Sequence, residues 1–305
     1  MLQIVGGRKI LLRSEWHYPS TSHGRALRRR QMFFAHGLKS PIDERLLDER
    51  GRPSLHKQRR MPKIAIVAAI ERELWPLIKN WRSVKAEHED REFTFYESDY
   101  AVAVCGGMGA EYGRRAAEAV IMKYSPEIMI SAGVAGALVP ELRVGDTVFP
   151  AVVIDARDGS RHESAIRDAA LGKTPLARTI LISSPDVAGA DRKQQLAKTY
   201  GAHVVDMEGA SVARAAQIHN LPFLAIKAIS DEVNFELAGL NRFIRNGQFQ
   251  TKLLIFYLLP RPWLWLKMIR LARNTQLASQ NLCAWLRESA LTNTIIPGTI
   301  SSHQS

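Results

Sequence analysis

Cysteine is scarce in this sequence, and long apolar runs are absent. The 305 residues include two cysteines, Cys105 and Cys283, which lie far apart and outside any Cys-x-x-Cys pattern. Neither a disulfide framework nor a metal site is therefore indicated, and a cytoplasmic protein is expected because the cytosol is reducing. No apolar run reaches the roughly 18 to 20 residues that span a bilayer, and the first residues lack the pattern of a secretory signal peptide.

Acidic residues are scarce only in the first part of the chain. Residues 1–60 contain 14 Lys and Arg against 5 Asp and Glu, whereas the remaining residues contain 28 against 25, so residues 1–60 carry most of the formal net charge of +12. A nearly neutral body lacks the basic surface that nucleic-acid binding requires, and we expect no nucleic-acid partner. High charge without hydrophobic periodicity predicts that residues 1–60 form a disordered basic leader.

The first domain-like pattern begins at Met61 with "MPKIAIVAAIERELWPLI". Our hypothesis is that residues 1–60 result from a start codon placed too early, with an Arg-rich targeting peptide as the alternative. The mass of the native N-terminus tests this, because a mature protein that begins near residue 1 contradicts the hypothesis. We expect one domain over residues 61–260, a helical extension over 261–290 and a disordered tail over 291–305.

Apolar strands alternate with amphipathic helices from residue 63 onward. "KIAIVAAI" predicts a strand buried on both faces, and "ERELWPLIKNW" predicts the helix that follows. Further strands are predicted in "FTFYES", "YAVAVCGG", "EIMISAG", "TVFPAVVIDA", "ARTILISS", "AHVVDMEG" and "PFLAIKAIS", and further helices over about 110–123, in "ADRKQQLAKTY" and in "GASVARAAQIHN". This alternation predicts an α/β fold: a single three-layer α/β/α domain whose mixed, mostly parallel central sheet has helices on both faces.

Residues suited to catalysis follow several of these strands, where ligands of such sheets bind. "AAIERE" carries Glu73, "VDMEGA" carries Met207 and Glu208, and "FLAIKAISDEVN" ends in two acids, of which Asp231 is the first. "CGGMG" and "SAGVAGA" supply glycine turns, at which backbone can approach a ligand closely. Structural alternatives are a capping role for Glu73, a helix N-cap or a salt-bridged loop acid for Asp231, and a core role for Met207. Their shared position predicts one site.

Three segments together resemble the purine nucleoside phosphorylase and methylthioadenosine/S-adenosylhomocysteine nucleosidase superfamily. They are "KIAIVAAIERE", "SAGVAGALVPELRVGD" and "VVDMEGASVARAAQIHNLPFLAIKAISDEVN", and the resemblance covers about residues 61–260. Within this superfamily, "GLNRFIRNGQFQTK" and "RPWLWLKMIRLARNTQLASQNLCAWL" resemble the hopanoid-associated branch, which removes adenine from adenosylhopane. The resemblance implies the nucleoside phosphorylase fold and cleavage of a purine N-glycosidic bond.

The resemblance also implies a role for each candidate residue. Asp231 matches the general acid that protonates or hydrogen-bonds purine N7, and Glu73 matches the carboxylate that positions or deprotonates the attacking water. Glu208 matches the residue that binds the ribose hydroxyls, and Met207 packs under the sugar. The other implied substrate-binding residues are Gly107, Gly109, Gly133, Val134, Lys227 and Ser230. No metal or cofactor is implied, and phosphate would be a co-substrate only of a phosphorylase.

The sequence departs from the nucleosidase pattern at three places. Val134 replaces a Ser, Lys227 replaces an Arg, and Val187 or Ala188 replaces the aromatic residue over the base. The "SAGVAGA" segment also lacks the Arg with which phosphorylases bind phosphate, because a guanidinium can contact phosphate through two hydrogen bonds. We therefore expect hydrolysis rather than phosphorolysis. If the reaction were phosphorolysis, the cations available to bind phosphate would be Lys227, Arg157 and Arg161.

Two alternatives come from other functional classes. A dinucleotide-binding oxidoreductase would share the strand–helix pattern, but its only candidate fingerprint is "CGGMGAEYG", and the first unit, "IVAAIERE", has no glycine. A non-catalytic purine sensor would share the fold. Adenine distinguishes them, because an oxidoreductase would ignore it, a sensor would bind it without turnover, and a nucleosidase would bind it as product.

The segment "KLLIFYLLPRPWLWLKMIRLARN" mixes tryptophan with Lys and Arg. One interpretation is a final helix docked on the sheet. The other is a segment that lies in the membrane interface, since the apolar run before Pro260 is too short to span a bilayer. The expected partners are a small-molecule purine nucleoside, lipid-linked in one alternative, the inner membrane surface as a peripheral contact and, by resemblance, further copies in a homo-oligomer.

Overall fold

The computed structural model describes residues 64–165, 176, 178–236 and 239–291. The predicted leader over residues 1–60 and the predicted tail after residue 291 lie outside the described residues. The domain boundaries proposed from the sequence therefore stay predictions. No helix in the described ranges is long and apolar enough to cross a membrane.

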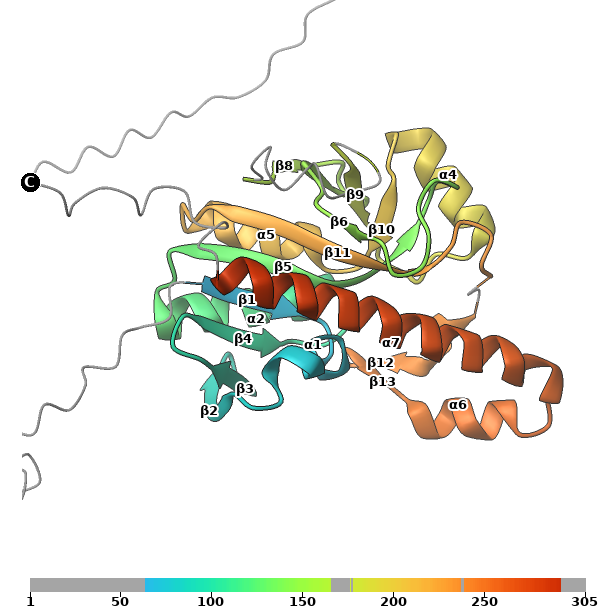
Figure 1. Cartoon of the computed structure of the whole chain (residues 1–305), viewed down its shortest axis with the longest axis horizontal. Coiled ribbons are helices and arrows are strands. Elements are labelled where there is room, and N and C mark those ends of the chain that lie inside the picture. The colour runs from blue at the N-terminus through green and yellow to red at the C-terminus, as the bar shows by residue number, and fades with distance from the viewer. Residues whose placement is uncertain (1–63, 166–175, 177, 237–238, 292–305) are drawn as a thin grey trace, which may run out of the picture. The chain divides into compact units, whose positions relative to one another are not determined.

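Eleven strands of the described chain form one sheet in the order β2-β3-β4-β1-β5-β10-β9-β7-β8, with β11 beside β5 and β6 beside β11 (Figure 1). The strands are β1 (Ile64–Ala68), β2 (Arg82–His88), β3 (Arg91–Glu97), β4 (Ala101–Cys105), β5 (Ile128–Ala137), β6 (Thr147–Val148), β7 (Val152–Asp155), β8 (Arg161–Glu163), β9 (Ile180–Ser183), β10 (Val204–Asp206) and β11 (Phe223–Asp231). At the centre, β1 pairs in parallel with β4 and β5, and β5 pairs in parallel with β11. Antiparallel pairs form the two edges, β2-β3-β4 and β7-β8. The predicted mixed sheet with a parallel centre is confirmed.

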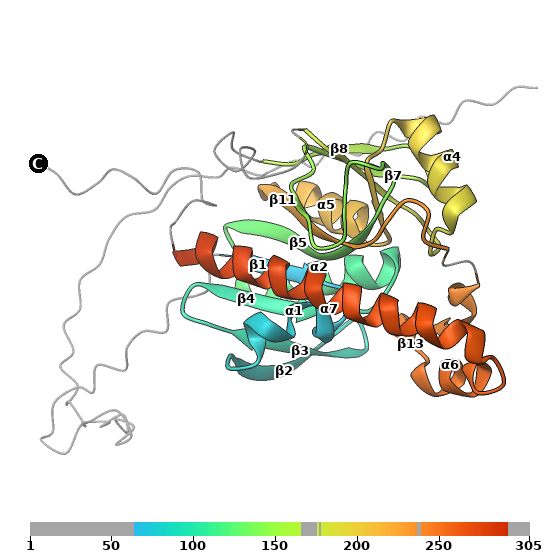
Figure 2. The same cartoon turned by 45° about the vertical axis from the view of Figure 1, so that its right-hand side comes forward.

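Helices cover both faces of this sheet, as predicted (Figures 1 and 2). On one face lie α1 (Glu71–Ile78) and the second half of α7 (Pro262–Leu291). On the other lie α2 (Ala110–Tyr124) and α5 (Gly209–Ile218), while α4 (Ala190–Tyr200) packs beside β9 and β10.

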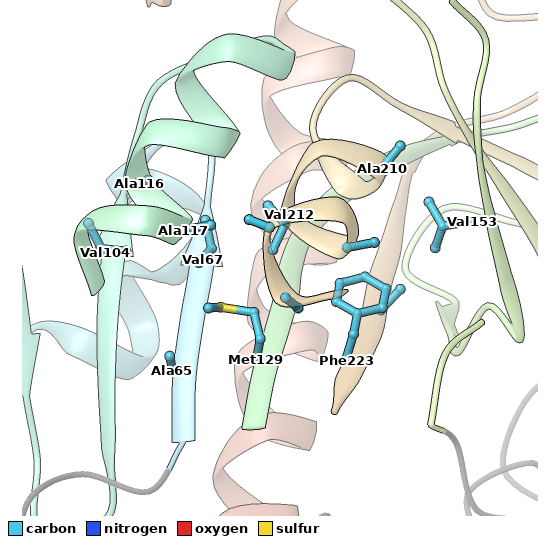
Figure 3. Packing of buried hydrophobic residues seen from close by; sticks show 14 of the residues in the cluster. Ala65, Val67, Val104, Ala116, Ala117, Met129, Val153, Ala210, Val212 and Phe223 are labelled. Carbon is cyan, nitrogen blue, oxygen red and sulfur yellow. The ribbon is translucent and has the colours of Figure 1, made fainter. Parts of the chain in front are cut away.

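The strand β1 shows why the sequence folds in this way. Alternate side chains of a strand point to opposite faces of the sheet. Ala65 and Val67 pack in the cluster beneath α2 and α5 (Figure 3), and Ile64 and Ile66 pack in the cluster beneath α1 and α7. Both faces are apolar, so the strand is a continuous apolar run that the sequence pattern reveals.

Parts of the sheet differ from the prediction. The edge strands β2 and β8 were not predicted, because most of their side chains are exposed or half-buried and form no apolar run. The predicted glycine turn "SAGVAGA" is instead the second half of β5, which continues to Ala137. Its glycines provide space: a Cβ on Gly133 would lie 3.1 Å from Glu73 Oε2, and one on Gly136 would lie 2.9 Å from Asp231 Oδ2.

After β11 the chain forms the 3₁₀ helix η2 (Leu240–Phe243), the short hairpin β12 (Ile244–Arg245) and β13 (Gln248–Phe249), and then α6 (Thr251–Leu258) and α7. The hairpin was not predicted. In α7 the first buried side chain is Ala278, and the second half packs on the sheet through Leu282, Cys283 and Leu286. The helix that docks on the sheet is therefore this second half, which follows the segment "KLLIFYLLPRPWLWLKMIRLARN". That segment lies within residues 251–277, which bury no side chain, so the docked-helix interpretation does not hold for it.

Candidate active site

A pocket of about 150 Å³ lies at the carboxyl ends of β1, β5, β10 and β11. The parallel strands β1, β5 and β11 end at the same edge of the sheet, and β10 pairs antiparallel with the last residues of β5, so residues distant in sequence meet there. Six of the predicted site residues line it: Glu73, Val134, Met207, Glu208, Ser230 and Asp231. Two more, Gly133 and Lys227, line a small adjoining cavity that Glu73 and Glu208 share with the pocket.

Asp231 ends β11, a strand in which every residue is buried. Ser230 Oγ donates a hydrogen bond to Asp231 Oδ1 over 2.7 Å. The Lys193 ammonium group, carried by α4, donates to Asp231 Oδ2 and, over 2.8 Å, to the carbonyl oxygen of Glu232. Both carboxyl oxygens of Asp231 therefore accept a hydrogen bond, and the residue lines the pocket.

Lys193 is the site residue that sequence reasoning missed. It lies in "ADRKQQLAKTY", a polar stretch typical of a solvated helix face, yet its side chain is buried and lines the pocket. The only local signal is its spacing from Leu196, which is three residues away and also buried, since such residues share one face of a helix. Its partner, Asp231, is 38 residues away in sequence.

The substitution Gly136→Ala tests whether Asp231 must keep this position. The new Cβ would lie 2.9 Å from Asp231 Oδ2 and 3.2 Å from Lys193 Cε, so the ion pair has to move. We expect turnover to fall about 10- to 100-fold, the range for displacing a catalytic group by about 1 Å. The control is Gly201→Ala, whose Cβ meets nothing within 4 Å and strains only a backbone with φ of 61°. Full turnover by the Gly136 variant would contradict a positional requirement.

Glu73 lies in the first turn of α1 and points into the pocket. Its Oε2 accepts the backbone N–H groups of Ala69 over 3.3 Å and Ile70 over 3.5 Å, so it also caps the helix. Burial raises the pKa of Glu73 from 4.5 to about 7, against the opposing effects of the Lys227 charge and of backbone N–H groups. A carboxyl group with this pKa is half ionised near neutral pH, which suits a general base.

Glu208 and Met207 follow β10 and line the pocket together. The backbone N–H of Gly109 donates to Glu208 Oε1 over 2.5 Å. Burial, and then the negative charge of Asp206, raise the pKa of Glu208 above its ordinary value. A carboxyl group desolvated in this way gains from hydroxyl groups that bind to it, as two ribose hydroxyls would.

Lys227 forms a second buried ion pair beneath the pocket. Its Nζ lies 2.8 Å from Asp206 Oδ2 and donates to Ser131 Oγ over 3.1 Å. Burial lowers the pKa of Lys227, but Asp206, Glu208 and Glu73 together raise it further, so the side chain is charged. Asp206, which the sequence did not suggest as a site residue, also accepts hydrogen bonds from Ser183 Oγ and the N–H of Gly209.

Gly107 and Gly109, the two predicted site residues of "CGGMG", line neither the pocket nor the adjoining cavity. A Cβ on Gly107 would lie 2.9 Å from the carbonyl oxygen of Gly247, and Gly109 contacts Glu208 through its N–H. Met108, between them, lines the pocket, and its N–H donates to Gly247 O over 2.7 Å. The role of these glycines is therefore to shape the loop, because both have positive φ.

The two arginines that the sequence offered for phosphate binding lie outside the pocket. Arg157 pairs with Asp155 over 2.6 Å and does not line the pocket, and neither does Arg161. Within the described residues, one group of His and carboxylate side chains could hold a metal ion: His88, Glu89 and Glu118. Its two carboxylates already pair with Arg114, and none of the three lines the pocket.

Residues 63–178 and 169–253 match the Phosphorylase superfamily, and the chain belongs to this family. The Phosphorylase superfamily consists of enzymes, so this protein is an enzyme. This match contradicts the alternative of a dinucleotide-binding oxidoreductase. The glycines of its candidate fingerprint, "CGGMGAEYG", instead shape a loop whose Gly109 N–H donates to Glu208.

Two bacterial relatives are nucleosidases by name. The aminodeoxyfutalosine nucleosidase of Campylobacter jejuni is 24% identical over 198 residues, which cover 56% of this chain and 86% of that protein. The 5'-methylthioadenosine/S-adenosylhomocysteine nucleosidase of Maridesulfovibrio salexigens is 27% identical over 209 residues, which cover 56% and 87%.

Solved structures share the fold. The futalosine hydrolase of Helicobacter pylori aligns with a TM-score of 0.57 at 19% identity and covers 76% of this chain and 98% of that one. The 5'-methylthioadenosine/S-adenosylhomocysteine nucleosidase of Helicobacter pylori aligns with a TM-score of 0.58 at 18% identity and covers 76% and 99%.

Proposed function

We propose that this enzyme hydrolyses the N-glycosidic bond of a 5′-substituted adenosine and releases adenine. The observation that carries the proposal is the pocket itself, in which the carboxyl groups of Glu73 and Asp231 arrive from different strand ends. The nucleosidase relatives support the reaction class. Two carboxyl groups in different surroundings can divide acid and base roles between them.

The proposed reaction requires one proton to leave water and another to reach the base. Glu73 takes a proton from water as the water oxygen bonds to C1′ of the sugar, and the bond from C1′ to purine N9 breaks. Asp231, protonated when the substrate reacts, transfers its proton to N7, so that adenine leaves neutral and Asp231 is left as a carboxylate. Lys193, which donates to Asp231, is the nearest protonated group that could replace this proton. As proposed, these steps require no metal or cofactor.

The charge of the pocket supports water over phosphate as the nucleophile. Five carboxyl groups line the pocket (Glu73, Asp186, Asp206, Glu208 and Asp231). The two lysines nearby are already paired, Lys193 with Asp231 and Lys227 with Asp206. The pocket groups that remain ionised beyond these pairs, Asp186 and the ionised fraction of Glu73, repel a phosphate dianion, but they stabilise the positive charge that develops on the sugar as the bond breaks.

The size of the pocket supports a substrate whose 5′ group extends outside it. Pockets that enclose drug-sized molecules occupy roughly 300–1,000 Å³, and this one has about 150 Å³. We propose an apolar 5′ group, with adenosylhopane, the substrate of the branch that the C-terminal segments resemble, as the leading example. The enzyme would then act as a cytoplasmic homo-oligomer in peripheral contact with the inner membrane surface.

Adenine release from several 5′-substituted adenosines, with and without phosphate, tests the proposal. We expect release without phosphate, at a rate that added phosphate does not increase, and a product sugar that carries oxygen from water. Turnover in proportion to phosphate would establish phosphorolysis instead. Binding of adenine without turnover of any nucleoside would leave the purine sensor as the function.

A further inference from the structure

The helix α6 and the first half of α7 form an apolar surface that nothing in the described chain covers. In Figure 1 they lie side by side, as a helical hairpin at the end of α7 remote from the sheet. Helices with apolar residues all round are ordinarily buried, yet no side chain of residues 251–277 is buried. Nine large apolar side chains of these residues are exposed, and six of them define the docking surface: Ile255, Phe256, Leu259, Trp263, Leu266 and Ile269.

Positive charge surrounds this docking surface. Residues 237–287 contain eight Lys and Arg and no Asp or Glu. Lys252, Arg270 and Arg273 are exposed on the same two helices, and Arg261 and Lys267 are half-buried. Exposed tryptophan and leucine beside Lys and Arg are the composition of a helix that lies at the headgroup level of a bilayer.

We propose that the docking surface binds the face of a bilayer that contains anionic phospholipids. The charge decides between this occupant and a second copy of the chain. A two-fold interface would place the same basic segment of each copy against the other, and like charges brought together repel. Anionic headgroups neutralise those cations, while the acyl region accepts the apolar side chains.

The chain on either side of the docking surface contacts residues at the pocket. Met108 and Val187 line the pocket, and their N–H groups donate to Gly247 O and Asn241 Oδ1, each over 2.7 Å. Gly247 and Asn241 belong to the segment just before α6. From α7, Arg270 lies 3.8 Å from the carboxylate of Glu232, the residue after Asp231. A bilayer at the docking surface would therefore lie beside the pocket. This step rests on the proposed function: an apolar 5′ group of the substrate would stay in the bilayer while the adenosine part enters the pocket.

Sedimentation of the full chain with vesicles tests the docking surface. We expect binding to vesicles that contain phosphatidylglycerol, little binding to pure phosphatidylcholine, and release by salt, since each basic residue near the surface contributes about fivefold in affinity. Trp263→Ser with Leu266→Ser should weaken binding at least about tenfold, because both side chains would enter the bilayer. The matched control is Met122→Ser with Ile218→Ser: these side chains are 68% and 67% exposed, against 69% and 79% for Trp263 and Leu266.

Several outcomes would overturn this proposal. The first is wild-type protein that does not bind phosphatidylglycerol vesicles at low salt. The second is an equal loss of vesicle binding in the two double variants. The third is a large fall in the melting temperature of the Trp263 and Leu266 variant, which would show that these side chains are packed in the core. Light scattering identifies a subunit interface if that variant reduces the oligomer instead. Adenine release, measured separately on soluble nucleosides, tests the proposed function: turnover without vesicle binding refutes the docking surface alone, and vesicle binding without turnover refutes the function alone.

Discussion

Asp231→Asn should lower turnover by about 10² to 10⁴, the range for loss of a general acid. Asparagine keeps the shape of the side chain, but it cannot deliver a proton to the purine. Steady-state adenine release on the same 5′-substituted adenosine measures the effect. A variant that keeps half of the wild-type turnover would remove Asp231 from the mechanism.

Stability must be separated from chemistry in this experiment, because Asp231 is half of a buried ion pair with Lys193. Breaking a buried pair by removing one partner costs about 3–5 kcal/mol, since the other charge stays buried and unpaired. The double variant Asp231→Asn with Lys193→Met removes both charges. We expect it to unfold at a higher denaturant concentration than the single Asp231→Asn variant and to remain inactive, which would assign the lost activity to the missing acid.

Glu73→Gln should lower turnover by about 10² to 10⁴ as well, because the amide cannot accept a proton from water. The kcat/KM of the wild type should rise with pH through about 7, as Glu73 ionises. In the variant this rising part of the pH profile should disappear. A variant whose turnover and pH profile match the wild type would leave Glu73 only its capping contacts with Ala69 and Ile70.

The same substitution should stabilise the protein at high pH. The pKa of Glu73 is about 7 in the folded protein and 4.5 ordinarily. Between these pH values the folded state binds more protons than the unfolded state, so stability falls as pH rises. The difference between the two pKa values corresponds to a loss of about 3 kcal/mol in the free energy of unfolding. This loss is absent below pH 4.5 and complete above pH 7. Urea unfolding at about pH 5 and about pH 8 measures it; a stability difference between variant and wild type that is the same at both pH values contradicts the assignment.

Much of the fold could be predicted from the sequence, because the central strands are buried on both faces. Such strands, β1 and β11 among them, are continuous apolar runs. The edge strands β2 and β8 escaped prediction, since an edge strand is held by backbone pairing and needs little apolar sequence. The extension of β5 through Gly133 and Gly136 escaped too, because glycine there provides space for side chains from elsewhere, which the local sequence does not show.

The acids of the candidate site could be predicted because each lies at the end of an apolar strand or within a few residues of it. Glu73 and Glu208 follow β1 and β10, Asp231 ends β11, and the sheet brings these strand ends to one pocket. Their catalytic and binding roles stay predictions that the experiments above test. The membrane interpretation was suggested by composition, but composition alone did not separate the exposed first half of α7 from the docked second half.

The sequence by itself determined the strand–helix alternation, the acids at the strand ends and the basic, tryptophan-containing segment near residue 263, because each is a local pattern. Only the tertiary structure decided which cations meet these acids. Lys193 reaches Asp231 from α4, and Lys227 pairs with Asp206 beneath the pocket. In a sequence, a lysine is expected to be solvated, because burying its charge is costly. Only folding brings to it the distant carboxylate that makes such burial stable.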